Sequence, residues 1–524
     1  MYWEVTILSS LMKKFFAQLK IVFLLSLLTA CSDKIPNKFS PGSFDHADRQ
    51  LQLALEQQAN TQQAKGIILF IGDGMSIATV TASRIFAGQK EGKTGEEHQL
   101  FFETFAYTGL SKTYNTNQQT PDSAGTMTAM VTGSKTKSGL LSVNTLATRA
   151  DPDSCNDYNL KTLLETAEEQ GWASGIVTTT SVTHATPAAT YAHSPERNWE
   201  SDKDLSLKAK SKGCRDIASQ LAEFDYGNGI EVILGGGRKH FLPEDKKGER
   251  QDNRNLIQEW LVNNKKSSYV NSASELANVD LKKSKHLLGL FSESHLSYEA
   301  DRLTDNEDQP SLTTMVETAL AILQQHKQFL LIVESGRIDH AHHAGNAYRA
   351  LDETIEFDRA VQRASELVDK DKTLMIVTAD HSHTLTLGGY PTRGNPILGF
   401  VKGNDKHGNP KEDASLATDN KPYTTLSYAN GLGHYAEDIN DFDPHSGDPY
   451  SRMSSPPKSG RHTTLKDNPE SLHYHQESNT PLHSETHAGD DVAVYAQGPW
   501  AHLLIGVMEQ NYIYHVMKHA GELE

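Results

Sequence analysis

The stretch KQFLLIVESGRIDHAHH (327–343) joins two kinds of sequence with no spacer between them. Its first part, 327–333, is a continuous apolar run of strand length, which is typical of a strand buried on both faces. The second part crowds together side chains that commonly bind metal ions; they are Glu334, Asp339, His340, His342 and His343. We therefore expect a buried strand whose carboxyl end opens on a polar site.

Three more segments repeat this continuous apolar, β-branched run: KGIILFIGDGM (65–75), WASGIVTTT (172–180) and KTLMIVTADHSH (372–383). The helix-like stretches between the runs are 159–171, 255–264, 312–326 and 347–368. Alternation of strands and helices predicts an α/β fold, with a large, mostly parallel central sheet and helices on both faces. In such sheets ligands bind beyond the carboxyl ends of the strands. The polar residues after 333 would stand at that edge.

The composition excludes some classes of protein. With 37% hydrophobic and 22% charged residues among 524, the chain is typical of a soluble globular enzyme. A formal net charge of −17 argues against nucleic acid as a partner, because nucleic-acid binders normally carry a basic face. Anionic small substrates are not excluded, since bound metal ions invert the local field.

Residues 1–31 have the pattern of an export signal. Three lysines, the last of them Lys20, precede the apolar run IVFLLSLLTA (21–30), which is too short to span a bilayer. The following LTAC resembles the lipobox of bacterial lipoproteins, with Cys31 as the lipidated residue, and an ordinary secretory signal is the alternative. We expect an exported protein of the periplasm or cell envelope, lipid-anchored to the outer membrane if the host is Gram-negative. A polar tether and a short helix would occupy 32–62.

Two cysteines, Cys155 and Cys214, remain once Cys31 is assigned to lipid. In an exported chain they form either one disulfide or a pair of buried thiols.

The segment 389–482 differs in amino-acid composition from the rest of the chain. It is rich in Gly, Pro, Asp, Asn and Ser, and we interpret it as an inserted, loop-rich subdomain with solvated histidines. The α/β domain would then comprise 63–388 and resume at 483–524. The run ILGGGRKH (233–240) lacks the ending of a phosphate-binding loop, and we interpret it as a tight turn after a strand.

Carboxylates follow three of the four strand ends. Asp73 follows the first run, and Asp380, with a histidine beside it, follows the last. Asp339 and His343 are four residues apart, so in a helix they share one face and can grip a single ion. His487 stands in the late segment ETHAGDD. Buried together without a cation, these carboxylates would repel one another, so we predict a metal site; mixed His and Asp ligands favour zinc.

The stretch TPDSAGTMTAMVTG (120–133) combines a helix N-cap with a serine. Capping is the purely structural explanation of Asp122. Ser123 would stand in the first helical turn, where free N–H groups and the helix dipole favour an anion. A serine hydroxyl must lose its proton to a base or a metal, so serine beside metal ligands indicates phosphoryl transfer. Arg197 is either a solvated loop residue or a clamp on two phosphate oxygens.

Taken in order, the segments FIGDGM, PDSAGTMTAMVTG, VTTTSVTHATPAATYAHSPERNW, VESGRIDHAHH, VTADHSH and ETHAGDDVAVYA resemble alkaline phosphatase. The resemblance covers about residues 64–520. It is closer to the members with histidine in the third metal site, including the animal enzymes. It implies hydrolysis of phosphate monoesters through a phosphoserine, a homodimer, and a crown-like position for the 389–482 insertion. It also implies that Cys155 and Cys214 form a disulfide.

The resemblance further implies a site of two zinc ions and one magnesium ion. The first zinc would be held by Asp339, His343 and His487, the second by Asp73, Asp380 and His381 alongside Ser123, and the magnesium by Asp73, His184, Thr186 and Glu334. Ser123 would be the nucleophile, Arg197 would clamp the phosphate with Asp122 beside it, and His383 would lie near the zinc pair. His340 and His342 are expected to be structural.

This sequence also departs from the family pattern. Animal members hold calcium with a Glu directly after a Phe, whereas Ser292 follows Phe291 here and Gln309 stands at another carboxylate position, so no calcium is expected. Related phosphodiesterases or sulfatases are the nearest rivals; the former generally lack the third metal site, and the latter need a Cys/Ser-x-Pro-x-Arg motif. A lipoprotein that captures zinc without catalysis would leave Ser123 and Arg197 unused.

Overall fold

The computed structural model of the chain describes residues 42–305, 307–433 and 464–524. The chain divides into two compact units, Met1–Gln58 and Ala59–Glu524. In the first unit the described part is helix α2 (Phe44–Glu56), which begins after Ser43, whose Oγ accepts a hydrogen bond from His46 N at 3.1 Å. The expected export signal and Cys31 lie outside the described residues.

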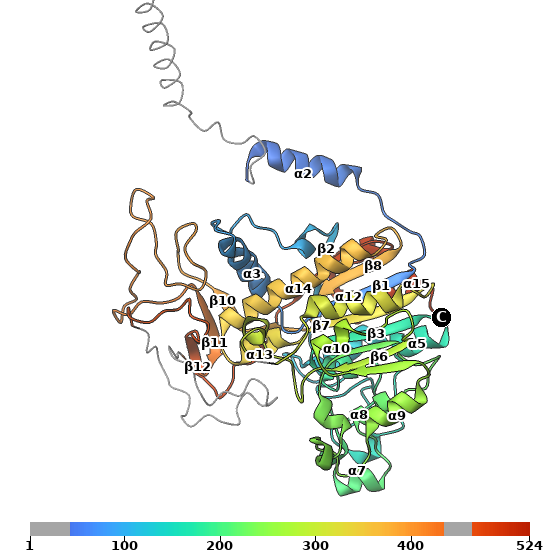
Figure 1. Ribbon diagram of the computed structural model, residues 1–524. Coiled ribbons are helices and arrows are strands. Elements are labelled where there is room, and N and C mark those ends of the chain that lie inside the picture. Colours follow the sequence, from blue (N-terminus) through green and yellow to red (C-terminus); the bar gives the residue numbers. More distant parts are fainter. Residues whose placement is uncertain (1–41, 306, 434–463) are drawn as a thin grey trace, which may run out of the picture. The chain divides into compact units, whose positions relative to one another are not determined.

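Ten strands of the described residues form one sheet in the second unit (Figure 1), in the order β15-β2-β14-β8-β1-β7-β3-β4-β6-β5. Strand β14 is antiparallel to both of its neighbours, and the other pairs are parallel. The prediction of a large, mostly parallel sheet is therefore confirmed. The strands are β1 (Gly66–Gly72), β2 (Tyr107–Lys112), β3 (Ala173–Ser181), β4 (Val232–Gly236), β5 (Ser267–Val270), β6 (His286–Leu290), β7 (Phe329–Ser335), β8 (Thr373–Thr378), β14 (Val492–Gln497) and β15 (Gly506–Glu509).

Strand β1 shows why these apolar runs become central strands. All of its residues are buried, and successive side chains point to opposite faces of the sheet. Ile67, Leu69 and Ile71 belong to the core on one face, and Ile68 and Phe70 belong to the core on the other. A strand covered on both faces cannot alternate apolar with polar residues, which explains the continuous run in the sequence.

Helices cover the two faces of the sheet (Figure 1). One core includes α4, α5, α8, α9 and α15, and the other includes α3, α12 and α14. The helices are α3 (Ile77–Lys90), α4 (Ser123–Thr132), α5 (Leu163–Glu169), α6 (Ala185–Ala188), α7 (Leu207–Ser211), α8 (Ile217–Ala222), α9 (Leu256–Asn263), α10 (Ala273–Ala277), α11 (Glu299–Arg302), α12 (Leu312–Leu323), α13 (Arg337–His343), α14 (Ala347–Leu367) and α15 (Tyr512–Gly521), with 3-10 turns η1 (Phe101–Thr104), η2 (Pro152–Ser154), η3 (Asp202–Asp204), η4 (Arg238–Phe241), η5 (Glu244–Lys246) and η6 (Ala501–Leu503).

Helix α5 begins later than the helix predicted at 159–171. A capping box fixes its start, because Thr162 Oγ1 accepts from Glu165 N at 3.1 Å and the Glu165 carboxylate accepts from Thr162 N at 2.8 Å. The residues before Thr162 are therefore not helical.

Two smaller sheets stand beside the main one. The first has the order β10-β11-β12, formed by β10 (Leu385–Leu387), β11 (Leu426–Gly431) and β12 (Ser478–Pro481). The second pairs β9 (Ser382–His383) with β13 (His487–Ala488). In the described part of 389–482 the named elements are β11 and β12, and the remainder consists of turns and irregular chain. His434, His445 and His462 lie outside the described residues. The prediction of solvated histidines is wrong for His475, which is buried with Nδ1 2.7 Å from Ala344 O.

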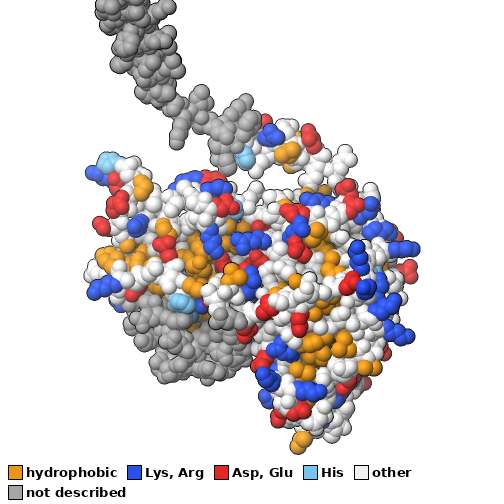
Figure 2. Space-filling view, viewed as in Figure 1, with side chains coloured by type: hydrophobic (Ala, Val, Ile, Leu, Met, Phe, Trp, Pro, Cys, Tyr) orange, Lys and Arg blue, Asp and Glu red, His pale blue; other side chains and the backbone are white. Residues whose placement is uncertain are grey.

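The disulfide between Cys155 and Cys214 is confirmed, with a Cα–Cα distance of 5.5 Å. Among the described residues, no helix is both long enough and apolar enough to cross a bilayer. Figure 2 shows acidic and basic side chains interspersed with apolar patches on the face of the 59–524 unit that it presents.

Candidate metal centre

Four adjacent strands bring the predicted ligands to one edge of the sheet. Asp73 follows β1, and Asp380 lies just beyond the end of β8. Glu334 is the penultimate residue of β7, and the next helix, α13, carries Asp339. Because β8, β1, β7 and β3 are parallel neighbours, their carboxyl ends meet at the same edge. His487 reaches this edge from β13, which pairs with β9 directly after Asp380 and His381.

The first group is a compact triangle of Asp339, His343 and His487. Asp339 Oδ1 lies 3.3 Å from His343 Nε2 and 3.2 Å from His487 Nε2, and the two Nε2 atoms are 3.1 Å apart. Ligand atoms on a tetrahedral zinc ion stand roughly 3.3 Å apart, which follows from bonds of about 2.0–2.1 Å. These three side chains therefore fit one zinc ion.

The other ring nitrogens of this group are already used. His343 Nδ1 lies 2.6 Å from Glu485 O, and His487 Nδ1 lies 2.8 Å from Pro121 O, so each Nδ1–H donates to a backbone carbonyl. Each Nε2 then carries a free lone pair that faces the triangle, the usual arrangement of metal-binding histidines.

The second group consists of Asp73, Asp380 and His381, all buried. His381 Nε2 lies 3.4 Å from Asp73 Oδ1 and 3.3 Å from Asp380 Oδ2. Ser123 Oγ lies 3.2 Å from the same nitrogen, so the serine adjoins the ligand atoms of this group. Gly74 N donates to Asp380 Oδ1 at 3.0 Å, which fixes the orientation of that carboxylate.

The third group consists of Asp73, His184 and Glu334, whose ligand atoms lie within 4.8 Å of one another. Several buried polar atoms here have no hydrogen-bond partner among the described residues: Asp73 Oδ1 and Oδ2, His184 Nδ1, Thr186 Oγ1 and Glu334 Oε1. Such orphaned atoms are rare in folded proteins unless an ion or water satisfies them. They belong to the four residues predicted for the third ion.

The carboxylates of the site need a cation. Burial, followed by the neighbouring charges of Asp380, Asp339 and Glu334, raises the pKa of Asp73 well above its ordinary value. Burial likewise raises the pKa of Glu334 to about 7, although Thr178 and Thr180 donate hydrogen bonds to it. Divalent cations would keep both groups ionised, so the residues present fit the ions that the resemblance implies.

Ser123 opens α4, and Asp122 is its N-cap. Asp122 Oδ1 accepts from Gly125 N at 3.1 Å and from Asn115 Nδ2 at 2.9 Å. Arg197 Nη1 lies 3.2 Å from Asp122 Oδ2, and Arg197 Nη2 lies 3.2 Å from His184 Nε2. Asp122 thus caps the helix that carries the serine and also positions the guanidinium, so its structural and functional explanations both apply.

Some residues of the site were not found from the sequence. His383 lies near the first group as expected, with Nε2 2.7 Å from Asp339 Oδ1, but its other partner, Glu485 Oε2 at 2.5 Å from Nδ1, was missed. Glu485 is fully buried and also accepts from Thr384 N at 2.6 Å. Its position directly before Thr486 and His487 was the only available signal.

The two histidines expected to be structural make their hydrogen bonds to residues outside the three ligand groups. His342 bridges Thr79 Oγ1 at 3.0 Å and Tyr428 Oη at 2.8 Å. His340 Nδ1 lies 3.0 Å from Arg337 Nη1.

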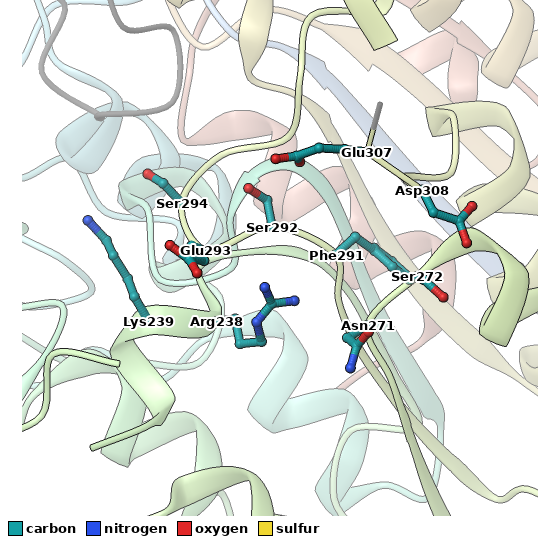
Figure 3. Close-up of a pocket in the computed structure, with 10 residues that line it drawn as sticks. All are labelled: Arg238, Lys239, Asn271, Ser272, Phe291, Ser292, Glu293, Ser294, Glu307 and Asp308. Carbon is teal, nitrogen blue, oxygen red and sulfur yellow. The ribbon is translucent and has the colours of Figure 1, made fainter. Parts of the chain in front are cut away.

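A separate cavity of about 650 Å³ is lined by Ser292, one of the residues at which the sequence departs from the animal family members (Figure 3). Ser292 and Phe291 line it together with Arg238 and Lys239. Gln309, nearby in the sequence, uses its amide oxygen to accept from Ser297 N at 2.8 Å.

A serine at a helix N-terminus, beside three buried His and carboxylate groups at the carboxyl edge of a parallel sheet, defines a metal-dependent phosphotransfer hydrolase. The match to known proteins is more specific. The family model for alkaline phosphatase matches residues 64–523, and the chain belongs to that family. It is an enzyme that hydrolyses phosphate monoesters. The alternative functions raised by the sequence, those of a phosphodiesterase, a sulfatase or a zinc-capturing lipoprotein, do not apply.

Curated relatives cover nearly the whole chain. It is 41% identical over 493 residues to the alkaline phosphatase of Gadus morhua, covering 91% of this chain and 96% of that one. It is 42% identical over 519 residues to the tissue-nonspecific isozyme of Gallus gallus, covering 95% and 93% respectively. The crystal structure of Thermus thermophilus alkaline phosphatase superposes with a TM-score of 0.62 at 25% identity, covering 90% of this chain and 94% of that one.

Proposed function

We propose that the chain hydrolyses phosphate monoesters through a phosphoserine on Ser123, at a site of two zinc ions and one magnesium ion. The observation that carries this proposal is the position of Ser123 Oγ, 3.2 Å from His381 Nε2, at the N-terminus of α4. A hydroxyl in that place adjoins a ligand group and faces the free N–H groups of a helix.

Three sets of residues would hold the three ions. Asp339, His343 and His487 would hold one zinc, Asp73, Asp380 and His381 the other, and Asp73, His184, Thr186 and Glu334 the magnesium. Bound in pairs, such ions act as Lewis acids that favour ionised oxygen nucleophiles and stabilise both oxygens of an in-line displacement.

Ser123 Oγ attacks phosphorus from one side while the alcohol leaves from the other, which gives the phosphoserine. Water then attacks the same phosphorus, and Ser123 Oγ leaves with the electron pair of the O–P bond. Arg197 binds two non-bridging oxygens through both steps. Its guanidinium is already oriented by Asp122, so little side-chain entropy is lost on binding. The α4 N-terminus stabilises the phosphoryl charge.

Acid quenching tests the covalent step. The full-length protein is incubated with p-nitrophenyl phosphate, quenched in acid and mapped by mass spectrometry. We expect a phosphorylated peptide containing Ser123, and no such adduct in Ser123→Ala. The matched control is Ser134→Ala, just beyond the end of α4, which should keep both adduct and turnover. A phosphopeptide that persists in Ser123→Ala, or a Ser123→Ala enzyme of undiminished turnover, would contradict the proposal.

We further propose that the protein is exported and anchored through lipid on Cys31. The disulfide supports export, because such bonds persist in oxidising compartments. Mass spectrometry of the mature N-terminus checks the anchor: a diacylglyceryl-modified Cys31 is expected, and an unmodified N-terminus produced by ordinary signal cleavage would contradict it.

A homodimer, implied by the resemblance, is part of the same proposal. Light scattering on the purified protein should give twice the chain mass of 57.9 kDa, reduced by the removed signal. A monomer at micromolar concentration would contradict this part alone.

A further inference from the structure

Three loops beyond the carboxyl end of β4 bring together a second set of metal-binding side chains. They are Asp204 at the end of η3, His240 in η4, and Glu249 in the chain that follows η5. Their ligand atoms all lie within 4.8 Å of one another. None of the three is a predicted ligand of the main site.

His240 has the arrangement of a metal ligand. The residue is only 4% exposed, and its Nδ1 has no hydrogen-bond partner among the described residues. Nδ1 lies 2.6 Å from Glu249 Oε1, a carboxylate oxygen of the same cluster. Nε2 lies 3.2 Å from Glu200 Oε2. An imidazole with one nitrogen beside a carboxylate and the other directed at ligand oxygens is the usual carboxylate–histidine–metal pattern.

Glu200 is itself fixed in place. Thr183 Oγ1 donates to Glu200 Oε2 at 2.6 Å. An ionised Glu200 would hold the Nε2–H tautomer of His240. The lone pair of Nδ1 is then available on the side of Glu249 and Asp204.

The loops are held together independently of any ion. The buried guanidinium of Arg250, adjacent to Glu249, makes two bonds to Asp216, Nη1 to Oδ1 at 2.9 Å and Nη2 to Oδ2 at 3.1 Å. Asp202, in the same turn as Asp204, accepts from Gln251 N at 2.9 Å. The three candidate ligands are therefore preorganised, which lowers the conformational-entropy cost of binding an ion.

We propose that Asp204, His240 and Glu249 bind a further divalent metal ion of the zinc class, with Glu200 orienting the imidazole. An imidazole with two carboxylates suits zinc and its first-row neighbours, whereas calcium takes oxygen ligands. The exposed Asp204 leaves room for water to complete the coordination. The ion would tie η3, η4 and the Glu249 segment into one unit.

A purely ionic network is the competing explanation. Lys203 Nζ lies 3.2 Å from Glu249 Oε2, and a protonated His240 could pair with Glu249 and Glu200 without any metal. That explanation predicts a loss of stability when Glu249 is neutralised, but no change in bound metal.

Metal content decides between the two. The full-length protein is loaded with zinc, dialysed and analysed by inductively coupled plasma mass spectrometry, next to Glu249→Gln and Asp204→Asn. Both changes keep the size of the side chain and remove its charge. We expect each variant to carry one zinc fewer per chain than the unchanged protein. Glu244→Gln, an exposed carboxylate in η5, is the matched control and should lose none. Equal zinc content in all four proteins would overturn the proposal.

A second background separates this site from the main one. Asp339→Asn should lose zinc from the first group of the main site, and adding Glu249→Gln should remove one more equivalent. If Asp339→Asn loses no zinc while Glu249→Gln does, the proposed function fails and the further site stands. If only the Asp339 change lowers the zinc content, the further site fails and the main one stands.

Discussion

Replacing Asp339 by alanine tests the metal centre at its most connected residue. Asp339 Oδ1 lies 3.2 Å from His487 Nε2, 3.3 Å from His343 Nε2 and 2.7 Å from His383 Nε2. Alanine removes the anionic ligand of this group, so the charge of a bound divalent ion would be left uncompensated in a buried site, which is strongly disfavoured. We expect Asp339→Ala to lose one zinc per chain and almost all turnover.

Arg197 provides the scale for that loss. Its guanidinium supplies one preorganised group, and removal of one such donor typically lowers kcat by about 10²–10³, or ~2.7–4 kcal/mol. Asp339→Ala removes an ion rather than a donor, and ions of this kind lower the pKa of a bound water from about 15.7 to about 7. We therefore expect kcat to fall by more than ~10³-fold in Asp339→Ala. In Arg197→Ala we expect kcat to fall by about 10²–10³-fold while the metal content stays unchanged.

The assay is turnover of p-nitrophenyl phosphate together with metal analysis of the same preparations. Asp371→Ala is the control, because Asp371 is an exposed carboxylate in the turn before β8, at the amino end of that strand. It should retain both turnover and metal. Equal and mild losses of turnover in Asp339→Ala and Arg197→Ala, with zinc unchanged in both, would refute the reasoning.

Three further predictions concern stability and metal removal. Burial beside Glu231 raises the pKa of Glu168 from 4.5 to about 9. Between these two pH values the folded chain holds a proton that the unfolded chain releases, so the free energy of unfolding falls as the pH rises from 4.5 to about 9. Glu168→Gln should then stabilise the protein by about 1–3 kcal/mol near pH 9 and change little near pH 5, as measured by thermal melts; the same shift at both pH values would contradict this. Opening the disulfide by Cys155→Ser with Cys214→Ser should lower the free energy of unfolding by about 4 kcal/mol, from the loop-entropy relation for a separation of 59 residues, and a denaturant titration checks it. Chelation should abolish turnover and readdition of zinc with magnesium should restore it, whereas turnover that survives exhaustive chelation would argue against the metal centre.

The sequence predicted the central strands well and the outer ones poorly. β1, β3, β7 and β8 are buried on both faces, so each carries a continuous apolar run that can be recognised without a structure. β2 has half-exposed positions along its length and therefore lacks such a run. Its place in the sheet depends on pairing with β14 and β15, which are far away in the chain.

The candidate site divides in the same way. Asp339 and His343 could be paired from spacing alone, because they lie one helical turn apart on α13. Contacts between residues of different segments could not be predicted from spacing. Thr178 stands beside Glu334 only because β3 and β7 pair in that register. Glu485 reaches His383 only because β13 pairs with β9.

The large separation along the chain between α13 and β13 has a consequence for biosynthesis. Asp339 and His343 emerge from the ribosome well before His487, so a growing chain holds an incomplete triangle until β13 has been synthesised. The first group would bind an ion tightly only after β13 has paired with β9. If the chain is exported as we propose, zinc supply in the destination compartment, rather than in the cytosol, determines how many molecules mature into active enzyme.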